Sequence, residues 1–507
     1  MILDPATCQQ ARLSRDPRFD GKFYTAVLTT GIYCRPTCPA GPAKEENVRY
    51  YQNAVQAEFY GYQPCKRCKP ELSPNMPLPT LLEQAVEILS IQPTISVNDL
   101  ATKLDISERQ LQRYFEQHLG MLPKAFINQK RQINARNLLL TTTLSMPHIA
   151  SISGFTSLRS FNDNIKAQYK QTPSQIRTGS KRSKSDYLSV KLRYSQDLDF
   201  ALMLSFFRAR LIPGVEHIED TYQRTIELDG CSGWIEVSCP AKFKQVKDRN
   251  AKNNSDRNNA ADQNSLLNRE QFLQLDLHLD QYTALPKIIA RVRKMFDLDC
   301  ELDVITSTIG THDKIKQAIT AFPGLRLPGC WHHFEFSIRA ILGQQISVKA
   351  ATTLASRIAT RYGKPPCNKD IEYPQQLTLV FPSVSALSDA EFDNLGITNT
   401  RMRTLKTWVE FYGSNESLFD NAIDSEVFEQ QLCQLKGIGP WTANYLAMRG
   451  LSLPDAFPAA DLGIIKALST EQQKVTPKQI LNIAEQWRPW RAYAAIYLWH
   501  SLSLSNE

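Results

Sequence analysis

The sequence predicts a multidomain α+β protein made of four consecutive parts. At 507 residues the chain is several times longer than one ordinary domain, which has roughly 100–200 residues. Four of its 11 cysteines form two close pairs near the start, and the hydrophobic pattern of the remainder changes twice. It is helical over residues 81–177, alternates between strands and helices over residues 187–306, and is helical again from Lys314. We therefore expect domains at residues 1–77, 78–181, 187–309 and 310–507.

The positive charge of the chain is concentrated in one block. Residues 101–186 carry 14 Lys and Arg against five Asp and Glu, which accounts for the whole net charge of +8. A basic block in an otherwise neutral protein indicates a polyanionic partner. No apolar run approaches the roughly 20 residues that span a bilayer, and the first residues lack the apolar core of a signal peptide. We expect a cytoplasmic protein with no membrane partner.

The first part contains a predicted metal site. Cys34 and Cys38 form one close pair, and Cys65 and Cys68 form another. Four thiolates provide the closed tetrahedral site that zinc favours, and a module with so little aliphatic content needs the metal to fold. We expect one Zn²⁺ per chain, with the other seven cysteines as ordinary buried thiols.

The same region resembles a known family. The stretches FYTAVLTTGIYCRPTCPA and GYQPCKRCKP resemble the N-terminal domain of the Ada alkylation-response proteins. The resemblance implies that Cys34 is both a zinc ligand and a methyl acceptor, which takes the methyl group irreversibly from a methylphosphotriester in DNA. Zinc would keep this thiol deprotonated and nucleophilic. Arg35 and Arg67 are cations suited to the DNA phosphates.

The second part is predicted to bind DNA through two helix-turn-helix units, at residues 95–127 and 146–177. In the first unit Ser107 caps a helix that presents three polar side chains, those of Arg109, Gln112 and Arg113. In the second, Gly154 makes the turn before a helix that begins with Ser157, Arg159, Ser160 and Asn162. A helical bundle that does not bind DNA is the alternative.

The two units together resemble the AraC-type transcription activators. Two positions depart from that family: Ile165 stands where it has a second Phe, and Lys170 stands where it has Gly. The resemblance implies promoter DNA as a partner, a nucleoid-associated location, and RNA polymerase as a possible further partner.

The last part carries the sequence of a helical hairpin. Gly437, Ile438 and Gly439 form a tight turn, and a helix N-terminus follows at Pro440-Trp441-Thr442. We expect the backbone amides from Gly437 to Thr442 to hold a DNA phosphate. A Pro-containing loop then leads to Asp461, the pattern of the helix-hairpin-helix DNA glycosylase superfamily. The resemblance places Asp461 opposite the extruded nucleotide as the catalytic carboxylate; its alternative role is that of a helix N-cap.

Three longer segments resemble the AlkA family of 3-methyladenine DNA glycosylases: LRLPGCWHHFEFSIRAILGQQISVKAA, GPWTANYLAMRG and RPWRAYAAIYLWH. The resemblance implies a mixed α/β (TBP-like) domain at residues 187–309 before an all-α helix-hairpin-helix domain. It implies that Trp441, Tyr445 and Trp499 form an aromatic pocket for the flipped base, for which core packing is the alternative. Gln345 stands where that family inserts a leucine wedge.

Two absences narrow the predicted chemistry. Glycosylases that also cut the strand carry a Lys after the hairpin, where this chain has Trp441. Beyond residue 400 the chain has only Cys433, so we expect no iron–sulfur cluster. We therefore expect a monofunctional hydrolase of N-glycosyl bonds that excises alkylated bases from double-stranded DNA, fused to a methyl acceptor and transcription activator. The alternatives are a regulator with an inactive glycosylase-like half, and a metal or redox sensor unrelated to methylation.

Overall fold

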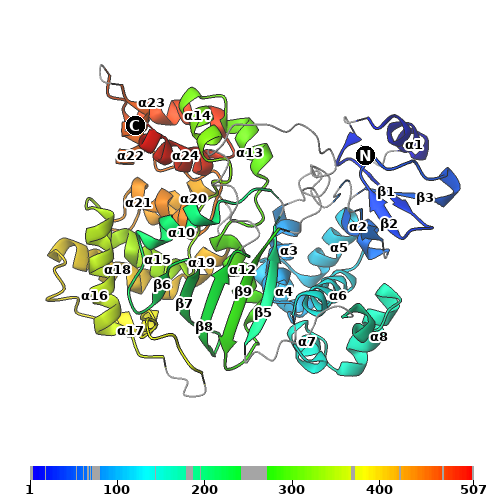
Figure 1. Ribbon diagram of the computed structural model, residues 1–507, viewed down its shortest axis with the longest axis horizontal. Coiled ribbons are helices and arrows are strands. Elements are labelled where there is room, and N and C mark those ends of the chain that lie inside the picture. The colour runs from blue at the N-terminus through cyan, green and yellow to red at the C-terminus, as the bar shows by residue number, and fades with distance from the viewer. Residues whose placement is uncertain are drawn as a thin grey trace, which may run out of the picture. The chain divides into compact units, whose positions relative to one another are not determined.

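The protein folds as two compact units, Met1–Ser183 and Lys184–Glu507 (Figure 1). The computed structural model describes residues 4–16, 19–52, 54–60, 62–65, 68, 70, 80–142, 144–177, 187–194, 196–240, 271–366, 371–421, 424–470 and 473–504. None of the helices within these residues is long and apolar enough to cross a membrane.

The first unit begins with a small sheet of four strands in the order β3-β1-β2-β4. Strand β1 pairs antiparallel with β2 and β3, and β4 runs parallel to β2. Tyr24, Ala26 and Tyr33 pack as its core with residues of α2, with Tyr51 of β3 and with Tyr62. The sequence pattern did not predict these short strands. Their bounds are α1 (Pro5–Ser14), β1 (Tyr24–Val27), β2 (Ile32–Cys34), η2 (Glu45–Asn47), β3 (Val48–Tyr51), α2 (Ala54–Phe59) and β4 (Gln63–Pro64).

The rest of the first unit is helical, and the two predicted helix-turn-helix units are confirmed. Helices α4 and α5 form the first and α7 and α8 the second, with the 19-residue α6 between them. Ser107 caps α5 in a capping box with Gln110. The bounds are α3 (Thr80–Ile91), α4 (Val97–Lys103), α5 (Glu108–Leu119), α6 (Pro123–Thr141), α7 (Met146–Ile152), α8 (Leu158–Tyr169) and α9 (Pro173–Ile176).

The two positions that depart from the AraC-type pattern keep the structural roles of the residues they replace. Ile165 is fully buried on α8, so it fills the core position of the missing Phe. Lys170 ends α8 with φ of 55°, in the left-handed conformation that glycine adopts at lower cost.

The second unit begins with a five-stranded antiparallel sheet in the order β5-β9-β8-β7-β6 (Figure 1). Helix α10 and the end of α12 pack against this sheet, where Phe207 and Phe296 contact Tyr222 of β7. The short edge strand β6 was not predicted. The bounds are β5 (Leu188–Arg193), α10 (Phe200–Arg208), β6 (Glu216–Ile218), β7 (Tyr222–Leu228), β8 (Cys231–Ser238), β9 (Phe272–Leu279) and α12 (Leu285–Met295).

The remainder of the second unit is helical, as predicted, around a large apolar core. Helices α15 and α24 pass through this core, since eight of the ten residues of α15 and nine of the 14 residues of α24 are buried. The bounds are α13 (Leu302–Ile309), α14 (Asp313–Ala321), α15 (His333–Leu342), α16 (Val348–Tyr362), α17 (Val384–Ser388), α18 (Asn399–Ser414), α19 (Glu416–Asn421), α20 (Ser425–Leu432), α21 (Pro440–Tyr445), η6 (Leu446–Gly450), α22 (Leu462–Leu468), α23 (Pro477–Ala484), η7 (Glu485–Trp487) and α24 (Arg491–Leu504).

Candidate active site and metal centre

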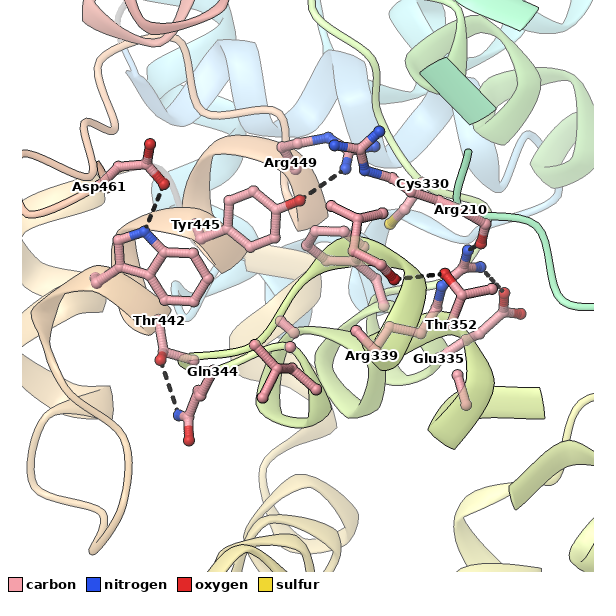
Figure 2. Close-up of a pocket in the computed structure, with 18 of the residues that line it drawn as sticks. Arg210, Cys330, Glu335, Arg339, Gln344, Thr352, Thr442, Tyr445, Arg449 and Asp461 are labelled. Atoms are coloured by element: carbon pink, nitrogen blue, oxygen red, sulfur yellow. Dashed lines mark hydrogen bonds and ion pairs between the residues drawn. The ribbon is translucent and has the colours of Figure 1, made fainter. Parts of the chain in front are cut away.

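The second unit contains a cavity of about 1090 Å³ between its sheet and its helices (Figure 2). Its walls come from α10, β6, β7, α15, α16, α21 and the residues that precede α22. Every site residue that the sequence predicted for this half lines it: Gln345, Gly437, Gly439, Trp441, Thr442, Tyr445, Asp461 and Trp499. Side chains far apart in sequence therefore meet at one place.

The predicted hairpin lies between α20 and α21, at the rim of this cavity. Gly437 has φ of 94°, and a Cβ there would lie 2.1 Å from Thr404 Oγ1, so only glycine fits. Gly439 is the N-cap residue of α21, and a Cβ at this position would meet nothing within 4 Å. The turn is thus packed on one side and open on the other.

The Asp461 carboxylate accepts four hydrogen bonds. Oδ1 accepts from the backbone N–H of Gly463 (2.8 Å) and Ile464 (3.2 Å), so Asp461 is the N-cap of α22, and from Trp499 Nε1 (2.9 Å). Oδ2 accepts from Trp441 Nε1 (2.9 Å). Three of these donors share Oδ1 and one reaches Oδ2, so Oδ2 can still accept one further hydrogen bond. The expected role of Asp461 as a helix N-cap is confirmed, and the same carboxylate lines the cavity.

The aromatic residues predicted for the base pocket surround this carboxylate. The rings of Trp441 and Tyr445 stack with centroids 5.1 Å apart, and Trp499 lies 6.4 Å from Tyr445 (Figure 2). The Tyr445 hydroxyl accepts a hydrogen bond from Arg449 (3.0 Å). Burial raises the pKa of Tyr445, but the guanidinium groups of Arg449 and Arg210 lower it more, so the pKa lies below its ordinary value of 10.

The loop between α15 and α16 is tied to the hairpin and carries Gln345 at its tip. Gln344 Nε2 donates to the Gly437 carbonyl oxygen (3.0 Å) and to Thr442 Oγ1 (2.9 Å). Gln345 is exposed and has φ of 57°, a strained conformation for a residue with a side chain. Thr442 is 3% exposed and its hydroxyl anchors this loop, so the group expected to hold a phosphate at this position is its backbone amide.

Sequence reasoning missed Asn444, which fixes the position of the Asp461 loop. Its Nδ2 donates to Glu429 of α20 (2.7 Å), and its Oδ1 accepts from the backbone N–H of Phe457 (3.1 Å). Phe457 lies four residues before Asp461. One amide thus joins the hairpin to the loop; the only sequence signal was that a polar residue stands on a buried face of α21.

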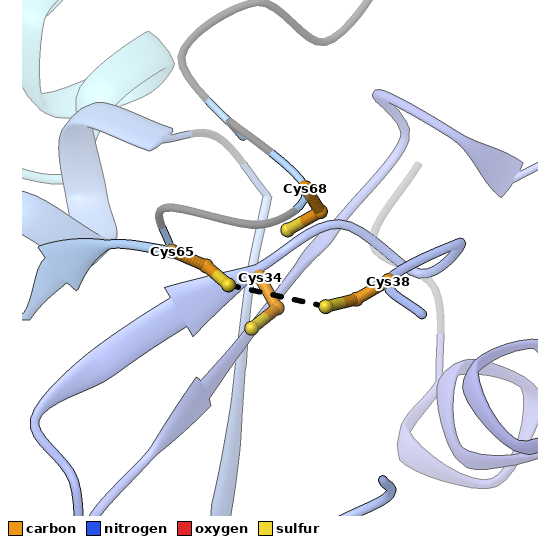
Figure 3. A group of neighbouring side chains, drawn as sticks. All are labelled: Cys34, Cys38, Cys65 and Cys68. Carbon is orange, nitrogen blue, oxygen red and sulfur yellow. Dashed lines mark hydrogen bonds between the residues drawn. The ribbon is translucent and has the colours of Figure 1, made fainter. Parts of the chain in front are cut away.

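The four predicted zinc ligands converge in the first unit (Figure 3). Strands β2 and β4 pair in parallel, with Tyr33 opposite Pro64. Cys34 and Cys65 directly follow these two residues and therefore lie side by side. All four Sγ atoms lie within 4.8 Å of one another, and those of Cys38 and Cys65 are 4.0 Å apart. A tetrahedron with Zn–S distances of about 2.3 Å has edges of about 3.8 Å, so the group fits zinc.

The electrostatics of the cysteine group favour a bound cation. A hydrogen bond from the Cys34 thiol lowers the pKa of Cys68 to about 6, and the same contact raises the pKa of Cys34. The backbone N–H of Arg35 donates to Cys68 Sγ (3.4 Å). The guanidinium of Arg35 is paired with Asp20, so the positive charge expected to face a DNA phosphate is already partly neutralised. Arg67 lies outside the described residues.

The other predicted positions are placed as follows. Arg109, Gln112 and Arg113 are exposed on α5, on the side opposite its buried Leu111 and Phe115. The side chains of Arg159 and Asn162 are exposed on α8, and that of Arg159 is 3.8 Å from Asp163. Of the seven cysteines expected as buried thiols, three are buried (Cys8, Cys231 and Cys300), Cys239 and Cys330 are half-buried, and Cys433 is exposed at the end of α20; Cys367 lies outside the described residues.

Three protein-family models match the chain. The metal-binding domain of Ada matches residues 7–71, a helix-turn-helix domain matches residues 100–179, and the AlkA N-terminal domain matches residues 189–332. The prediction of an Ada-type zinc domain with four clustered cysteines, consistent with one Zn²⁺, followed by a helix-turn-helix domain and an AlkA-type half, is confirmed.

One curated relative matches nearly the whole chain, and others match either its first or its second half. The probable bifunctional transcriptional activator/DNA repair enzyme AlkA of Mycobacterium tuberculosis is 32% identical over 98% of this chain and 96% of its own length. The DNA-3-methyladenine glycosylase 2 of Escherichia coli is 28% identical over 61% of this chain and 96% of its own length. The bifunctional transcriptional activator/DNA repair enzyme Ada of E. coli is 36% identical over 34% of this chain and 48% of its own length. The chain therefore belongs to the family of bifunctional transcriptional activator/DNA repair enzymes in which an Ada-type zinc domain and a helix-turn-helix domain are fused to an AlkA-type glycosylase.

Proposed function

We propose that this protein excises alkylated bases of the 3-methyladenine type from double-stranded DNA, and that Asp461 is the catalytic carboxylate. One observation carries the proposal: at the mouth of an aromatic-lined cavity, a carboxylate is fixed by the indole N–H groups of Trp441 and Trp499. A negative charge held rigidly in a partly buried site stabilises positive charge that develops beside it.

The alkylated base needs little help to leave. Alkylation at a ring nitrogen makes the purine cationic, so it departs as a neutral base and leaves an oxocarbenium-like sugar at C1′. Because four donors hold the Asp461 carboxylate in one orientation, we assign it electrostatic stabilisation of C1′ in preference to proton abstraction from water. The faces of Trp441 and Tyr445 that are not stacked on each other attract a cationic base by about 0.5–2 kcal/mol per contact.

Residues at the rim of the cavity bind the DNA backbone and the vacated base position. The amides from Gly437 to Thr442 hold a phosphate without reading bases. Gln345, exposed on its anchored loop, occupies the space that the flipped nucleotide vacates; flipping costs a few kcal/mol, less for a damaged base. With Trp441 at the position of the lyase lysine, no strand cleavage accompanies excision.

The first unit adds a second reaction and a regulatory output. Cys34, Cys38, Cys65 and Cys68 would hold one Zn²⁺, which would keep their sulfurs as thiolates at neutral pH. Cys34 attacks the methyl carbon of a methylphosphotriester, so that an S–C bond forms as the C–O bond breaks and the phosphate leaves as a diester. The exposed polar faces of α5 and α8 bind promoter DNA in the cytoplasm, on the nucleoid, where RNA polymerase is the partner that activation requires.

The test is incubation of the full-length protein with a methylated duplex, followed by mass spectrometry of the bases released and of the protein. Free 3-methyladenine together with a gain of one methyl group on the Cys34 peptide is the expected result. Methyl transfer without base release would leave a regulator with an inactive glycosylase half. If neither product is detected, the proposal is overturned and the protein is a metal or redox sensor.

A further inference from the structure

The inner end of the cavity contains two arginines that pair with no carboxylate of the described residues. Arg210 follows α10 and Arg449 belongs to η6, and both line the cavity. Among the described residues neither guanidinium is paired with an acidic side chain. Arg449 donates to the carbonyl oxygens of Pro328 (2.7 Å) and Gly329 (3.1 Å) and to the Tyr445 hydroxyl.

The remaining charges of this wall cancel one another. Glu335 pairs with Arg224 (2.7 Å) and with Arg339 (3.0 Å). Glu216 pairs with the same two arginines at 3.5 and 3.3 Å. Two carboxylates and two guanidinium groups therefore form a closed, neutral network. The positive charges of Arg210 and Arg449 remain in excess at this end.

Arg210 has donors to spare. Its guanidinium covers the ring of Phe206 at 3.7 Å and donates to the Phe206 carbonyl oxygen (3.0 Å). It also lies beside the Tyr445 hydroxyl. A guanidinium has five N–H groups, so within the described part of the chain most of those of Arg210 are left to a ligand or to water.

The cavity is therefore electrically polar along its length. Figure 2 shows Asp461 and Arg210 on opposite sides of Tyr445, whose hydroxyl points away from Asp461 toward Arg449. The carboxylate and the faces of Trp441 and Tyr445 favour positive charge at the mouth. The arginines favour negative charge at the inner end. The volume of about 1090 Å³ also lies just above the range of roughly 300–1,000 Å³ for pockets that hold drug-sized ligands, and it is much larger than one methylated purine needs.

We propose that this cavity selects alkylated purines whose alkyl group ends in a carboxylate, with Arg210 as the residue that binds the carboxylate. This inference rests on the proposed glycosylase function. Such a base is a zwitterion, with a cationic ring for the aromatic faces near Asp461 and an anionic tail for Arg210. The guanidinium fork is the side chain best suited to a carboxylate.

The reaction balances as for a methylated base. The bond between C1′ and N9 breaks, and its electron pair neutralises the purine ring. Water adds its oxygen to C1′ and releases one proton to solvent. The carboxylate keeps its charge throughout, so Arg210 acts in binding and in placing the ring.

The test uses two duplex substrates that differ by one charge. Treatment with iodoacetate gives N7-carboxymethylguanine, and treatment with iodoacetamide gives the neutral N7-carbamoylmethylguanine of nearly the same shape. Release of each base is followed by mass spectrometry, and kcat/KM for the charged base is divided by that for the neutral one. The full-length protein should give a ratio on the order of ten or more, since a charged hydrogen bond in a buried site contributes to discrimination.

Variants assign the effect to Arg210. In Arg210→Gln the ratio should fall to about one, whatever the variant does to overall rate, because the ratio is taken within one protein. Arg403→Gln is the matched control, since Arg403 is exposed on α18 outside the cavity, and it should keep the full ratio. An unchanged ratio in Arg210→Gln would overturn the assignment.

The outcome separates this inference from the proposed function. Release of 3-methyladenine with a ratio of one or less would overturn the inference and leave the glycosylase standing. Release of no base from any substrate would overturn the glycosylase proposal itself.

Discussion

Asp461→Asn should lower the excision of 3-methyladenine on the order of 10²–10³-fold, about 2.7–4 kcal/mol of transition-state stabilisation. The substitution removes the negative charge beside C1′ and preserves the shape of the side chain. The amide oxygen can replace Oδ1, which accepts three of the four hydrogen bonds and caps α22. The fold should therefore survive.

The substitution also destabilises the site at Oδ2, the second oxygen of the carboxylate. With the amide oxygen at the cap, its NH₂ group faces Trp441 Nε1–H, which now donates to Oδ2 at 2.9 Å. Two donors then oppose each other, and losing this bond should destabilise the site by about 1–3 kcal/mol. Some loss of binding to abasic-site DNA should follow, because Trp441 is a wall of the pocket.

Single-turnover release of 3-methyladenine from a methylated duplex measures the effect. Trp441→Phe removes the opposing N–H, so adding Asp461→Asn in that background isolates the charge and should again lower the rate on the order of 10²-fold. Asp424→Asn is the matched control, because Asp424 caps α20 through the same two kinds of hydrogen bond outside the cavity. Excision by Asp461→Asn within a few-fold of the unmodified protein would refute the catalytic role.

Four further substitutions test other parts of the molecule. Cys65→Ser should lose the bound zinc and unfold the cysteine module, whereas the exposed Cys433→Ser should retain one zinc by elemental analysis; full zinc content in Cys65→Ser would disprove the ligand set. Gln345→Gly should raise the free energy of unfolding by about 1 kcal/mol, because it relieves φ of 57°, and yet should slow excision from duplex more than from single-stranded DNA; equal slowing would exclude a wedge. Lys170→Gly should raise the melting temperature of the helix-turn-helix domain, by about 1 kcal/mol of stability, for the same reason. Burial raises the pKa of Asp297 from 3.8 to about 6, so the folded state binds its proton more tightly, and the free energy of unfolding should rise as pH falls from above 6 toward 4. A denaturation series in which Asp297→Asn shows the same pH dependence would contradict this assignment.

Local signals in the sequence were enough for the motifs and for the helical character of residues 81–177 and of the chain from Lys314, but not for α1 and α2 of the cysteine module. Ser107 was predicted as a cap because a hydroxyl before a periodic apolar run satisfies the first free N–H groups, and it forms a full capping box. Gly437 was placed in a tight turn, and both its φ and its contact with Thr404 require glycine. Such signals are readable because their energies arise within a few residues of chain. The short strands β1 to β4 and β6 were missed, because two to four residues are too few for a pattern.

What the sequence determined by itself was the identity of the reactive side chains: four cysteines at ligand spacing, a hairpin, a carboxylate and three aromatic rings. Only the tertiary structure decided how they act together. Trp441 and Trp499 lie 20 and 38 residues from Asp461, yet each donates a hydrogen bond to a different oxygen of its carboxylate. Arg210 and Arg449 are far apart in the sequence, yet both lie beside the hydroxyl of Tyr445. No periodicity or spacing encodes such meetings, because they depend on how helices and a sheet pack around one core, and packing is settled by the whole chain at once.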